Sequence, residues 1–469
     1  MRVLLVFFDT MRHDHAGCYG YKLDTTPNID RLARTGALFM NSYPTDVPTQ
    51  PCYTSVLTGK RGITTGVVSH GQPEDTIPVA MATLPKVLAE HGVLTAAVST
   101  LYRFRKWFAS GFTHYLQPDI KTWLQHVTAE QVNEQVIPWL RAYGASNDFF
   151  LFLHYWDPHT PYSDESKRYL QQFYSGDPYD PGNDSLDDLR SRPVLYNFIS
   201  GAVPELKEGV TDINYIVGLY DAEIFYADKC FGDVLATLEQ LKVLDDTIII
   251  FTSDHGESVH GEHGIYCDHM DAYEQVSHVP LVVSCPGRVA PRKIDALVQH
   301  IDIAPTVLES FGVKTPEEFE GRSLWPLLEG KKEEHYEAIF TNQGLWSAQR
   351  AMRTKEWSLV RTIDPGMLDP SFNLSAEPYT ELFDRKSDAA EVHDVSANNK
   401  EVLDELELRY HRWLDERLGA KSDPLRTAAS AAKVVKQRVR EALTAQQEAR
   451  RHDQPSPETR ARIDDNPRG

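Results

Sequence analysis

The feature that most constrains the fold is a series of short, mostly apolar segments separated by segments with helical periodicity. Val3–Phe8, Phe149–His154 and Thr247–Thr252 are apolar runs of strand length, whereas Leu84–His91 and Tyr215–Leu241 have the apolar spacing of amphipathic helices. Continuous apolar runs are typical of parallel strands that are buried on both faces of a sheet. The alternation predicts an α/β fold, in which a large, mainly parallel sheet is flanked by helices.

Polar residues directly follow three of these predicted strands. Asp9 ends the first run, the segment His154–His159 ends another, and Asp254 and His255 follow the run at Thr247. Ligand sites of open α/β sheets lie outside the carboxyl ends of the strands. We therefore expect these three segments, which are far apart in the sequence, to converge on one site.

The charge of the chain restricts its partners. Among its 469 residues, 48 Lys and Arg oppose 68 Asp and Glu, which gives a formal net charge of −20. Such a charge argues against nucleic acid or an anionic membrane as the main partner. It is compatible with a small anionic substrate, because a bound metal ion can reverse the local field.

Two further observations bear on the location of the chain. Its five cysteines form no CxxC pair, which excludes a disulfide scaffold and a thiolate zinc ribbon. The apolar run at the N-terminus is too short for the hydrophobic region of a signal peptide, and no run of about 18 apolar residues occurs. We therefore expect a cytoplasmic protein that makes no contact with a membrane.

Changes in composition divide the chain into three parts. Residues 1–333 carry the α/β pattern, and residues 163–210 within them are polar and without clear periodicity, as expected of an insert or lid. Residues 334–420 contain strand-like pieces and an amphipathic helix, which predicts a smaller α+β subdomain. We expect residues 421–469 to form a charged tail that is helical over Ala428–Arg451 and disordered over Pro455–Gly469. The tail could pair with a neighbouring subunit in a homo-oligomer, or it could be a solvated extension.

The pair Asp254 and His255 supplies adjacent oxygen and nitrogen ligands on a turn, where Gly256 permits close approach of the backbone. Together with Asp9, the pair predicts a divalent site suited to Ca, Mg or Mn, or a mixed oxygen and nitrogen site suited to Mn or Zn. The alternative is a surface turn that is capped by the aspartate.

The hydroxyl of Thr49 is a candidate nucleophile. A loop rich in Thr and Pro leads from Thr45 through Thr49 into the apolar helical segment Cys52–Thr58. A hydroxyl just ahead of a helix N-terminus is well placed for attack, because the free N–H groups and the helix dipole favour the anion that develops there. The alternative is that Thr49 only caps the helix.

A series of motifs extends over residues 1–418: Asp9–His15, Cys18–Tyr21, Thr26–Leu32, Thr49–Lys60, His154–Tyr162, Ser253–Gly256, Gly261–Gly264 and His300–Thr306. In this order they resemble the sulfatase family of the alkaline phosphatase superfamily. The family's nucleophile signature begins with a Cys or Ser that is matured to formylglycine, followed by x-Pro-Ser-Arg. Counting back from Thr58-Gly59-Lys60 places the nucleophile at Thr49, with Pro51 on the signature proline.

Several residues depart from the family pattern. Thr49 cannot form formylglycine, and Cys52 falls on the signature Ser rather than on the nucleophile. Tyr53 stands where sulfatases carry the signature Arg, and Thr10 stands where many carry a second metal-binding Asp. The usual Lys after Gly-Glu-His-Gly is absent, and the nearest residues there are Asp268 and His269. The changes alter the charge around the site.

The resemblance implies a mechanism similar to that of the phosphonate monoester hydrolase and phosphodiesterase branch. A divalent cation (Mn, Zn or Ca) would be bound by Asp9, Asp254 and His255 and would contact Thr49, lowering the pKa of its hydroxyl. Thr49 would attack phosphorus or sulfur and form a covalent intermediate that water releases. The expected contacts to substrate oxygens or the leaving group are His159, His269 and, with a structural role as its alternative, His278.

Three functions remain open at this stage. The preferred one is a metal-dependent hydrolase of phosphate diesters or phosphonate monoesters. The second is a sulfuric ester hydrolase that acts without formylglycine, and the third is an inactive family member that binds a ligand. The expected partner is a small-molecule phosphate, phosphonate or sulfate ester, selected by residues 163–210 and by the C-terminal subdomain.

Overall fold

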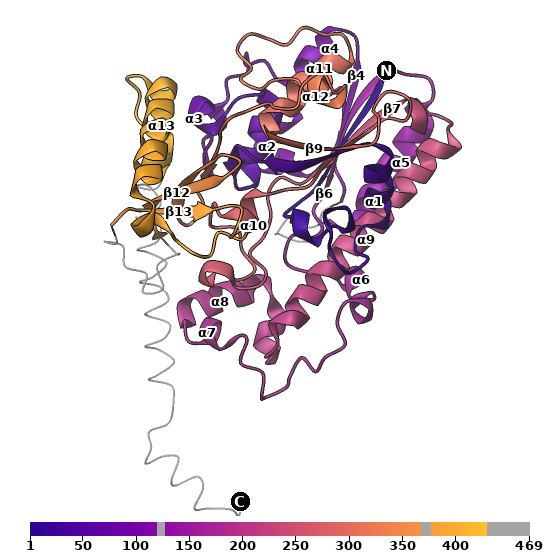
Figure 1. Ribbon diagram of the computed structural model, residues 1–469. Helices are drawn as coiled ribbons and strands as arrows, with labels where there is room; N and C mark the ends of the chain where they lie inside the picture. The colour runs from indigo at the N-terminus through magenta and orange to yellow at the C-terminus, as the bar shows by residue number, and fades with distance from the viewer. Residues whose placement is uncertain (120–126, 367–376, 429–469) are drawn as a thin grey trace, which may run out of the picture.

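The computed structural model describes residues 1–119, 127–366 and 377–428. Its centre is an eight-stranded sheet between two layers of helices (Figure 1). The strands, in spatial order, are β5 (His114–Leu116), β4 (Leu94–Val98), β6 (Phe149–Tyr155), β1 (Arg2–Phe8), β7 (Thr247–Thr252), β8 (Leu281–Ser284), β2 (Ala37–Tyr43) and β9 (Arg292–Gln299). Strand β8 runs antiparallel to both of its neighbours, and the other pairings are parallel. This arrangement confirms the predicted fold class.

Both faces of the large sheet are buried, which explains why its strands are continuously apolar. Along β1, Leu4, Val6 and Phe8 join one apolar cluster, and the alternate residues join the other. The first cluster is covered by α1 (Pro27–Thr35), α5 (Ala129–Trp139) and α9 (Ile213–Gln240). The second is covered by α2 (Thr49–Thr58), α4 (Leu84–Glu90), α11 (Ile303–Ser310) and α12 (Trp325–Leu328).

A second, smaller sheet lies beside the first. Its order is β13 (Tyr379–Asp384), β12 (Trp357–Asp364), β11 (Ala348–Arg353), β10 (Ile339–Gln343) and β3 (Asp46–Val47). Helix α13 (Lys400–Leu418) packs on it through Leu406 and Tyr410, which contact Phe340, Met352 and Leu359. Strand β3 comes from the N-terminal part of the chain and ends just ahead of α2. The small sheet is therefore joined directly to the segment that precedes Thr49.

The segment 163–210 is not a plain loop. It contains α6 (Asp164–Lys167), α7 (Asp187–Arg190) and α8 (Pro193–Ala202), and in Figure 1 the last two lie below the sheet. Leu189 of α7 and Leu195 of α8 join the apolar cluster that α9 covers. The remaining short helices of the main body are α3 (Gly62–Thr65) and α10 (Glu274–Ser277).

Some sequence expectations differ from the structure in detail. The helix expected at Cys52–Thr58 already begins at Thr49. Strand β2 was not expected, because its apolar run, Ala37–Met40, is short and is followed by the polar residues Asn41 and Ser42. Of the helix expected at Ala428–Arg451, the residues after 428 lie outside the described residues.

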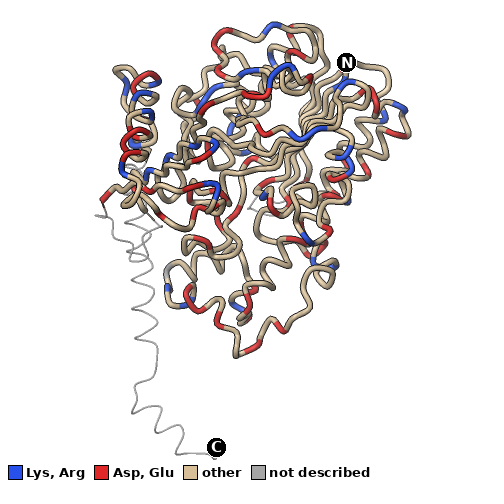
Figure 2. Tube along the Cα trace, viewed as in Figure 1, with Lys and Arg blue, Asp and Glu red and all other residues tan. Residues whose placement is uncertain are grey.

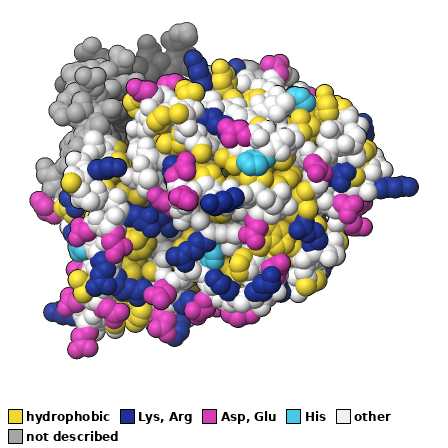
Figure 3. Space-filling model, turned by 90° about the horizontal axis from the view of Figure 1, so that it is seen from above, with side chains coloured by type: hydrophobic (Ala, Val, Ile, Leu, Met, Phe, Trp, Pro, Cys, Tyr) yellow, Lys and Arg dark blue, Asp and Glu magenta, His cyan; other side chains and the backbone are white. Residues whose placement is uncertain are grey.

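Charged residues lie mainly on the helices and loops, while the central strands carry few of them (Figure 2). Seen from above, Lys and Arg side chains alternate with Asp and Glu, and hydrophobic side chains form small groups between them (Figure 3). Neither sign of charge dominates that face. Among the described residues, no helix is both long and apolar enough to cross a membrane.

Candidate active site

The carboxyl ends of β6, β1 and β7 lie side by side in the large sheet. Phe7 of β1 is opposite His154 of β6 and opposite Thr252 of β7. Asp9 follows β1 and Asp254 follows β7, so the pairing register brings the two carboxylates to the same level. The structure thus joins the strand-end segments that the sequence predicted to converge.

Asp9, Asp254 and His255 form one compact group, in which one ligand atom from each residue lies within 4.8 Å of the others. All three side chains are completely buried, which excludes the alternative of a surface turn. Oδ1 of Asp254 accepts hydrogen bonds from the backbone amides of Thr10 (3.0 Å) and His255 (2.9 Å). These bonds fix the orientation of the Asp254 carboxylate.

The donor set of this group fits a divalent cation. Oδ1 of Asp9 and Oδ2 of Asp254 are buried and make no hydrogen bond with the described residues. Nδ1 of His255 lies 2.9 Å from the carbonyl oxygen of Gly256 and donates its proton there, so Nε2 presents a lone pair. Two buried carboxylate oxygens and an imidazole nitrogen are suitable ligands for Mn, Zn or Ca.

The electrostatics of the group agree with this interpretation. Burial, together with the neighbouring carboxylates of Asp254 and Glu257, raises the pKa of Asp9 well above its usual range. Burial also opposes ionisation of Asp254, but His255 and the Thr10 amide hold its pKa below the usual value. A buried carboxyl group with a raised pKa is stabilised in its charged form when a cation is bound beside it.

Thr49 is placed beside this group by helix α2. It is the first residue of the helix, is 2 % exposed, and has its Oγ1 3.3 Å from Nε2 of His255. The helix cap position is held by Pro48, and no side chain makes a capping hydrogen bond there. The hydroxyl of Thr49 is therefore not a helix cap and faces the candidate metal ligands.

The contacts of the neighbouring Cys52 argue against a role as nucleophile. Its Sγ lies 3.1 Å from the carbonyl oxygen of Asp254 and 3.1 Å from Nδ1 of His300. Burial raises the pKa of the Cys52 thiol well above its usual range, so the reactive thiolate is disfavoured. Cys52 instead packs α2 against the strand end that carries Asp254.

Two of the predicted histidines lie against the metal group. The ring centroid of His269 is 4.3 Å from that of His255 and 5.5 Å from that of His159. Burial lowers the pKa of both His159 and His269, which favours their neutral forms. Nδ1 of His269 lies 3.3 Å from Oε2 of Glu257. Neutral imidazoles that are oriented in this way are suitable hydrogen-bond donors to an anionic substrate.

The third predicted histidine, His278, belongs to a different cluster. Its Nδ1 lies 2.7 Å from Oε1 of Glu274, its Nε2 lies 2.9 Å from the carbonyl oxygen of Met40, and its ring stacks on His13 at 3.6 Å. Both ring nitrogens are thus engaged by the protein. These contacts favour the structural role that the sequence left as the alternative for His278, and the substrate contact stays a prediction.

Sequence reasoning missed His70. Burial, reinforced by the neighbouring His269, His255 and His159, lowers the pKa of His70 to about 3. The ring of His70 stacks on Phe104 at 5.8 Å, Phe104 lies 6.0 Å from Trp156, and Trp156 lies 5.4 Å from His159. Nδ1 of His70 is buried and makes no hydrogen bond with the described residues. The amide of Gly71 donates to Oε1 of Gln50 at 3.2 Å, which ties this loop to the residue next to Thr49. No motif marks His70, and its only signal is a position in the loop beyond the nucleophile helix.

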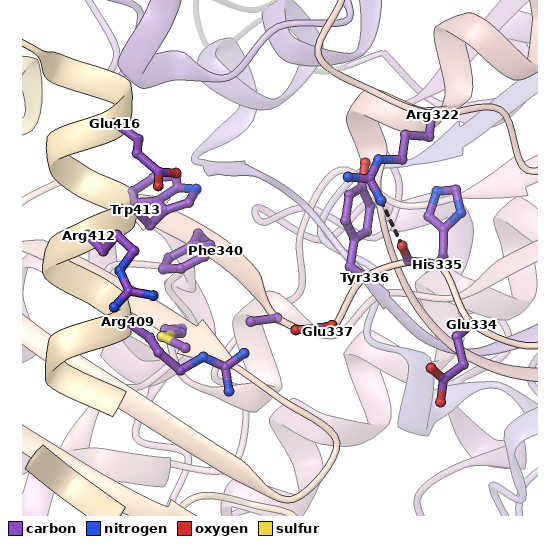
Figure 4. A pocket seen from close by; sticks show the side chains of 12 residues that line it. Arg322, Glu334, His335, Tyr336, Glu337, Phe340, Arg409, Arg412, Trp413 and Glu416 are labelled. Atoms are coloured by element: carbon purple, nitrogen blue, oxygen red, sulfur yellow. Dashed lines mark hydrogen bonds between the residues drawn. The ribbon is translucent and has the colours of Figure 1, made fainter. Parts of the chain in front are cut away.

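A cavity of about 600 Å³ lies elsewhere, between α13 and the segment that precedes β10. Trp413 stacks on Phe340 at one side of it, and Arg322 donates to the carbonyl oxygen of His335 at the other (Figure 4). None of the candidate catalytic residues lines this cavity. It is therefore separate from the group around Thr49.

Comparison with known proteins identifies the family. The family model described as Sulfatase matches residues 2–313, which is more than half of the chain. This chain belongs to the sulfatase family. A second model, described as the C-terminal part of N-sulphoglucosamine sulphohydrolase, matches residues 261–416. The resemblance that the motifs indicated is confirmed.

Curated relatives include two kinds of family member. The human iduronate 2-sulfatase is 28% identical over 389 residues, covering 70% of this chain and 68% of that protein. A multifunctional alkaline phosphatase superfamily protein of Trinickia caryophylli is 27% identical over 393 residues, covering 67% of this chain and 74% of that protein. This sulfatase family member is accordingly an ester hydrolase of the alkaline phosphatase superfamily.

Solved structures share the fold. A protein in complex with its substrate D-glucosamine-2-N,6-O-disulfate superposes with a TM-score of 0.70 at 20% identity, covering 90% of this chain and 99% of that one. The phosphonate monoester hydrolase from Silicibacter pomeroyi superposes with a TM-score of 0.67 at 19% identity, covering 90% and 96%. These structures show that the chain shares their fold. Its own described residues add an Asp/Asp/His group that can hold a metal ion.

Proposed function

We propose that this sulfatase family member is a metal-dependent hydrolase of phosphate diesters or phosphonate monoesters, with Thr49 as its nucleophile. The observation that carries the proposal is the buried hydroxyl of Thr49, 3.3 Å from Nε2 of His255 and at the N-terminus of α2. A residue of this type supplies an oxygen nucleophile without any maturation step. It also forms no aldehyde hydrate, so release of the bound group requires direct attack by water.

Each residue of the site has a separate role in the proposed reaction. A divalent cation (Mn, Zn or Ca) held by Asp9, Asp254 and His255 would lower the pKa of the Thr49 hydroxyl and offset the charge of the ester. As Oγ of Thr49 bonds to phosphorus, the bond from phosphorus to the leaving oxygen breaks, and that oxygen takes up a proton. Water then attacks phosphorus, the bond to Thr49 breaks, and the hydroxyl of Thr49 regains a proton. His159 and His269 hold the non-bridging oxygens or protonate the leaving group.

The charge of the site favours a singly charged substrate. Tyr53 presents a neutral phenol where sulfatases carry an arginine, and burial favours the neutral forms of His159 and His269. Few cations of the protein therefore face a substrate anion. Phosphate diesters, phosphonate monoesters and sulfate esters carry one negative charge, whereas a phosphate monoester carries close to two at pH 7.

The second candidate is a sulfuric ester hydrolase that acts without formylglycine. It is favoured by the match to the Sulfatase model and by relatives such as the iduronate 2-sulfatases and the N-acetylglucosamine-6-O-sulfatase of Bacteroides thetaiotaomicron. Its chemistry uses the same residues and differs in the central atom.

We propose that residues 163–210 select the leaving group. Arg192 donates to the carbonyl oxygen of Gly264 at 2.8 Å, and the hydroxyl of Tyr266 donates to Asp188 at 3.1 Å. These contacts dock the segment on the loop of the Gly-Glu-His-Gly motif, which leads to His269. A segment held there can contact the part of a substrate that extends out of the site.

The experiment uses protein reconstituted in turn with Mn, Zn and Ca. Hydrolysis of bis(p-nitrophenyl) phosphate, p-nitrophenyl phenylphosphonate and p-nitrophenyl sulfate is compared in the wild type and in Thr49→Ala. Turnover of the diester or the phosphonate that Thr49→Ala abolishes supports the proposal. Dominant turnover of the sulfate supports the second candidate, and turnover that Thr49→Ala leaves unchanged overturns the role of Thr49 as the nucleophile.

A further inference from the structure

The first residues of the predicted tail are part of the folded body. Asp423 and Leu425 are buried, and Leu425 packs against Val68 and Ala348. The side chain of Asp423 also accepts from the amide of Leu425 at 3.1 Å, which fixes the chain at this point. Residues 421–428 are called the C-terminal segment below.

Asp423 is the partner of a fully buried arginine. Nη1 and Nη2 of Arg350, in the middle of β11, donate to the two carboxylate oxygens of Asp423 at 3.1 and 3.0 Å. The same guanidinium donates through Nε to Oδ1 of Asn342 at 2.5 Å and through Nη1 to the hydroxyl of Tyr410 at 3.3 Å. A buried arginine of this kind requires a paired carboxylate, because an unpaired buried charge is strongly unfavourable.

The hydrogen-bonded chain continues to the segment that precedes the nucleophile. Nδ2 of Asn342 donates to Oδ1 of Asp46 at 2.8 Å, and the two residues are also paired in the small sheet. Oδ2 of Asp46 accepts from Oγ of Ser55, within α2, and from the amide of Gly62, both at 2.8 Å. Asp46 thus holds both the strand that leads to Thr49 and the helix that begins there.

A second, apolar connection reaches the loop of His70. A side chain at Gly344 would place its Cβ 2.1 Å from the carbonyl oxygen of Val68 and 3.1 Å from Leu425, so the three residues are in close contact. The amide of Gly344 donates to the carbonyl oxygen of Val47 at 3.2 Å. Val68 precedes His70 by two residues, so Leu425 supports the loop that carries His70.

We propose that the C-terminal segment is a positioning clamp for the active site. Asp423 acts through Arg350 and Asn342 on the segment of Thr49, and Leu425 acts through Val68 on the loop of His70. Neither residue touches substrate. The catalytic part of this inference rests on the proposed function, whereas the positional part concerns the structure alone.

Asp423 can affect turnover because the reaction requires a precise position of the Thr49 hydroxyl. When Asp423 loses its charge, the Arg350 guanidinium must find another partner, and Asn342 is the acceptor that already contacts it. When the hydrogen bond between Asn342 and Asp46 changes, Asp46 no longer holds β3 and α2 in place, and Thr49 at the start of α2 becomes more mobile. Displacement of a reacting group by about 1 Å is enough to reduce turnover strongly, even when the fold is kept.

The test uses full-length Asp423→Asn and Leu425→Ala, with Asp404→Asn and Leu408→Ala on the exposed side of α13 as matched controls. Hydrogen–deuterium exchange is measured over residues 46–58 and 66–71, and kcat and KM are measured for the ester that the wild type hydrolyses. We expect faster exchange at 46–58 in Asp423→Asn and at 66–71 in Leu425→Ala. We also expect kcat to fall about 10-fold in each, with KM little changed.

The readouts separate the alternatives. Unchanged exchange in both windows, or an equal rise over the whole protein, would show a merely structural role and overturn the proposal. The same holds if the controls change as much as the variants. If a variant does not fold, Leu425→Val takes its place, because it removes one methylene from the same contact. If the wild type hydrolyses no ester but exchange rises as expected, the proposed function fails and the clamp remains.

Discussion

The hydroxyl of Tyr53 donates a hydrogen bond of 3.4 Å to Oδ2 of Asp9, the oxygen that also lies 3.0 Å from Nε2 of His154. One carboxylate oxygen of Asp9 is thus held by two protein groups, while Oδ1 remains without a hydrogen bond to the described residues. Because Tyr53 is packed against Phe7 and His154, the orientation of Asp9 is fixed before any cation arrives.

Tyr53→Phe removes only the hydroxyl that orients Asp9. We expect the affinity for Mn to fall about 10-fold or more, since partners of metal ligands commonly contribute 10–100-fold. Isothermal titration of the metal-free protein measures the change. Tyr102→Phe, at a half-exposed tyrosine, is the control, and equal affinities of the wild type and Tyr53→Phe would contradict the expectation.

Replacement of Thr49 distinguishes the nucleophile from its neighbours. Thr49→Ala is expected to lower kcat by about 10³-fold or more, because the variant lacks the hydroxyl that forms the proposed covalent intermediate. Thr49→Ser keeps an oxygen nucleophile and should retain measurable turnover. Steady-state kinetics with the preferred ester measure both variants.

Cys52→Ser is the matched control, because Cys52 lies one helical turn further along α2. It should retain turnover, since its thiol contacts the carbonyl oxygen of Asp254 and His300 rather than the space beside Thr49. A loss in Cys52→Ser as large as that in Thr49→Ala would argue against Thr49 as the nucleophile.

His70→Ala tests the histidine that the sequence did not reveal. If His70 contacts substrate, kcat/KM should fall by about 10²-fold, the usual cost of one polar group in the transition state. Thermal unfolding should change little, because Nδ1 of His70 makes no hydrogen bond with the described residues. His393→Ala, at a histidine whose side chain is 81% exposed, should behave as the wild type. A lower Tm with unchanged kcat/KM would assign His70 a structural role.

The cluster around Glu274 predicts a dependence of stability on pH. Burial would raise the pKa of Glu274, but Arg385, His278 and Arg353 hold it well below its usual value of 4.5. A carboxyl group with a lowered pKa in the folded state stabilises the protein above its unfolded pKa, and this stability is lost as the pH falls further. The contribution of Glu274 is therefore complete above about pH 4.5 and decreases below it.

Glu274→Gln removes one of the two carboxylates that pair with the buried guanidinium of Arg353. We expect the free energy of unfolding at pH 7 to fall by about 3 kcal/mol, a typical cost of breaking a buried ion pair. Urea unfolding at pH 7, 4.5 and 3.5 should show that the difference from the wild type narrows below pH 4.5. A difference that stays constant over this range would show that the charge of Glu274 is not responsible.

The candidate metal ligands could be found from the sequence for a simple reason. Asp9, Asp254 and His255 follow apolar runs, and the carboxyl ends of parallel strands meet at one edge of the sheet. Thr49 was found by its position in a signature, and the structure adds that it is buried and is not a cap. These residues depend on local pattern, which a sequence displays directly.

The role of a lone histidine could not be predicted in the same way. His278 follows a short polar segment, and the sequence around it does not indicate that its two ring nitrogens contact Glu274 and the carbonyl oxygen of Met40. His70 lies in a loop without a motif, and only the folded structure shows that it stacks on Phe104, which packs through Trp156 towards His159.

The sequence by itself determined the α/β architecture, the family and the residue types that meet at the strand ends, because periodicity and short motifs are local properties. The tertiary structure alone decided that β3 pairs with β10, that Arg350 is matched by Asp423, and that residues 421–428 belong to the folded body. Those contacts join residues tens to hundreds of positions apart. Their energy comes from burial and charge pairing, which exist only after the chain has folded.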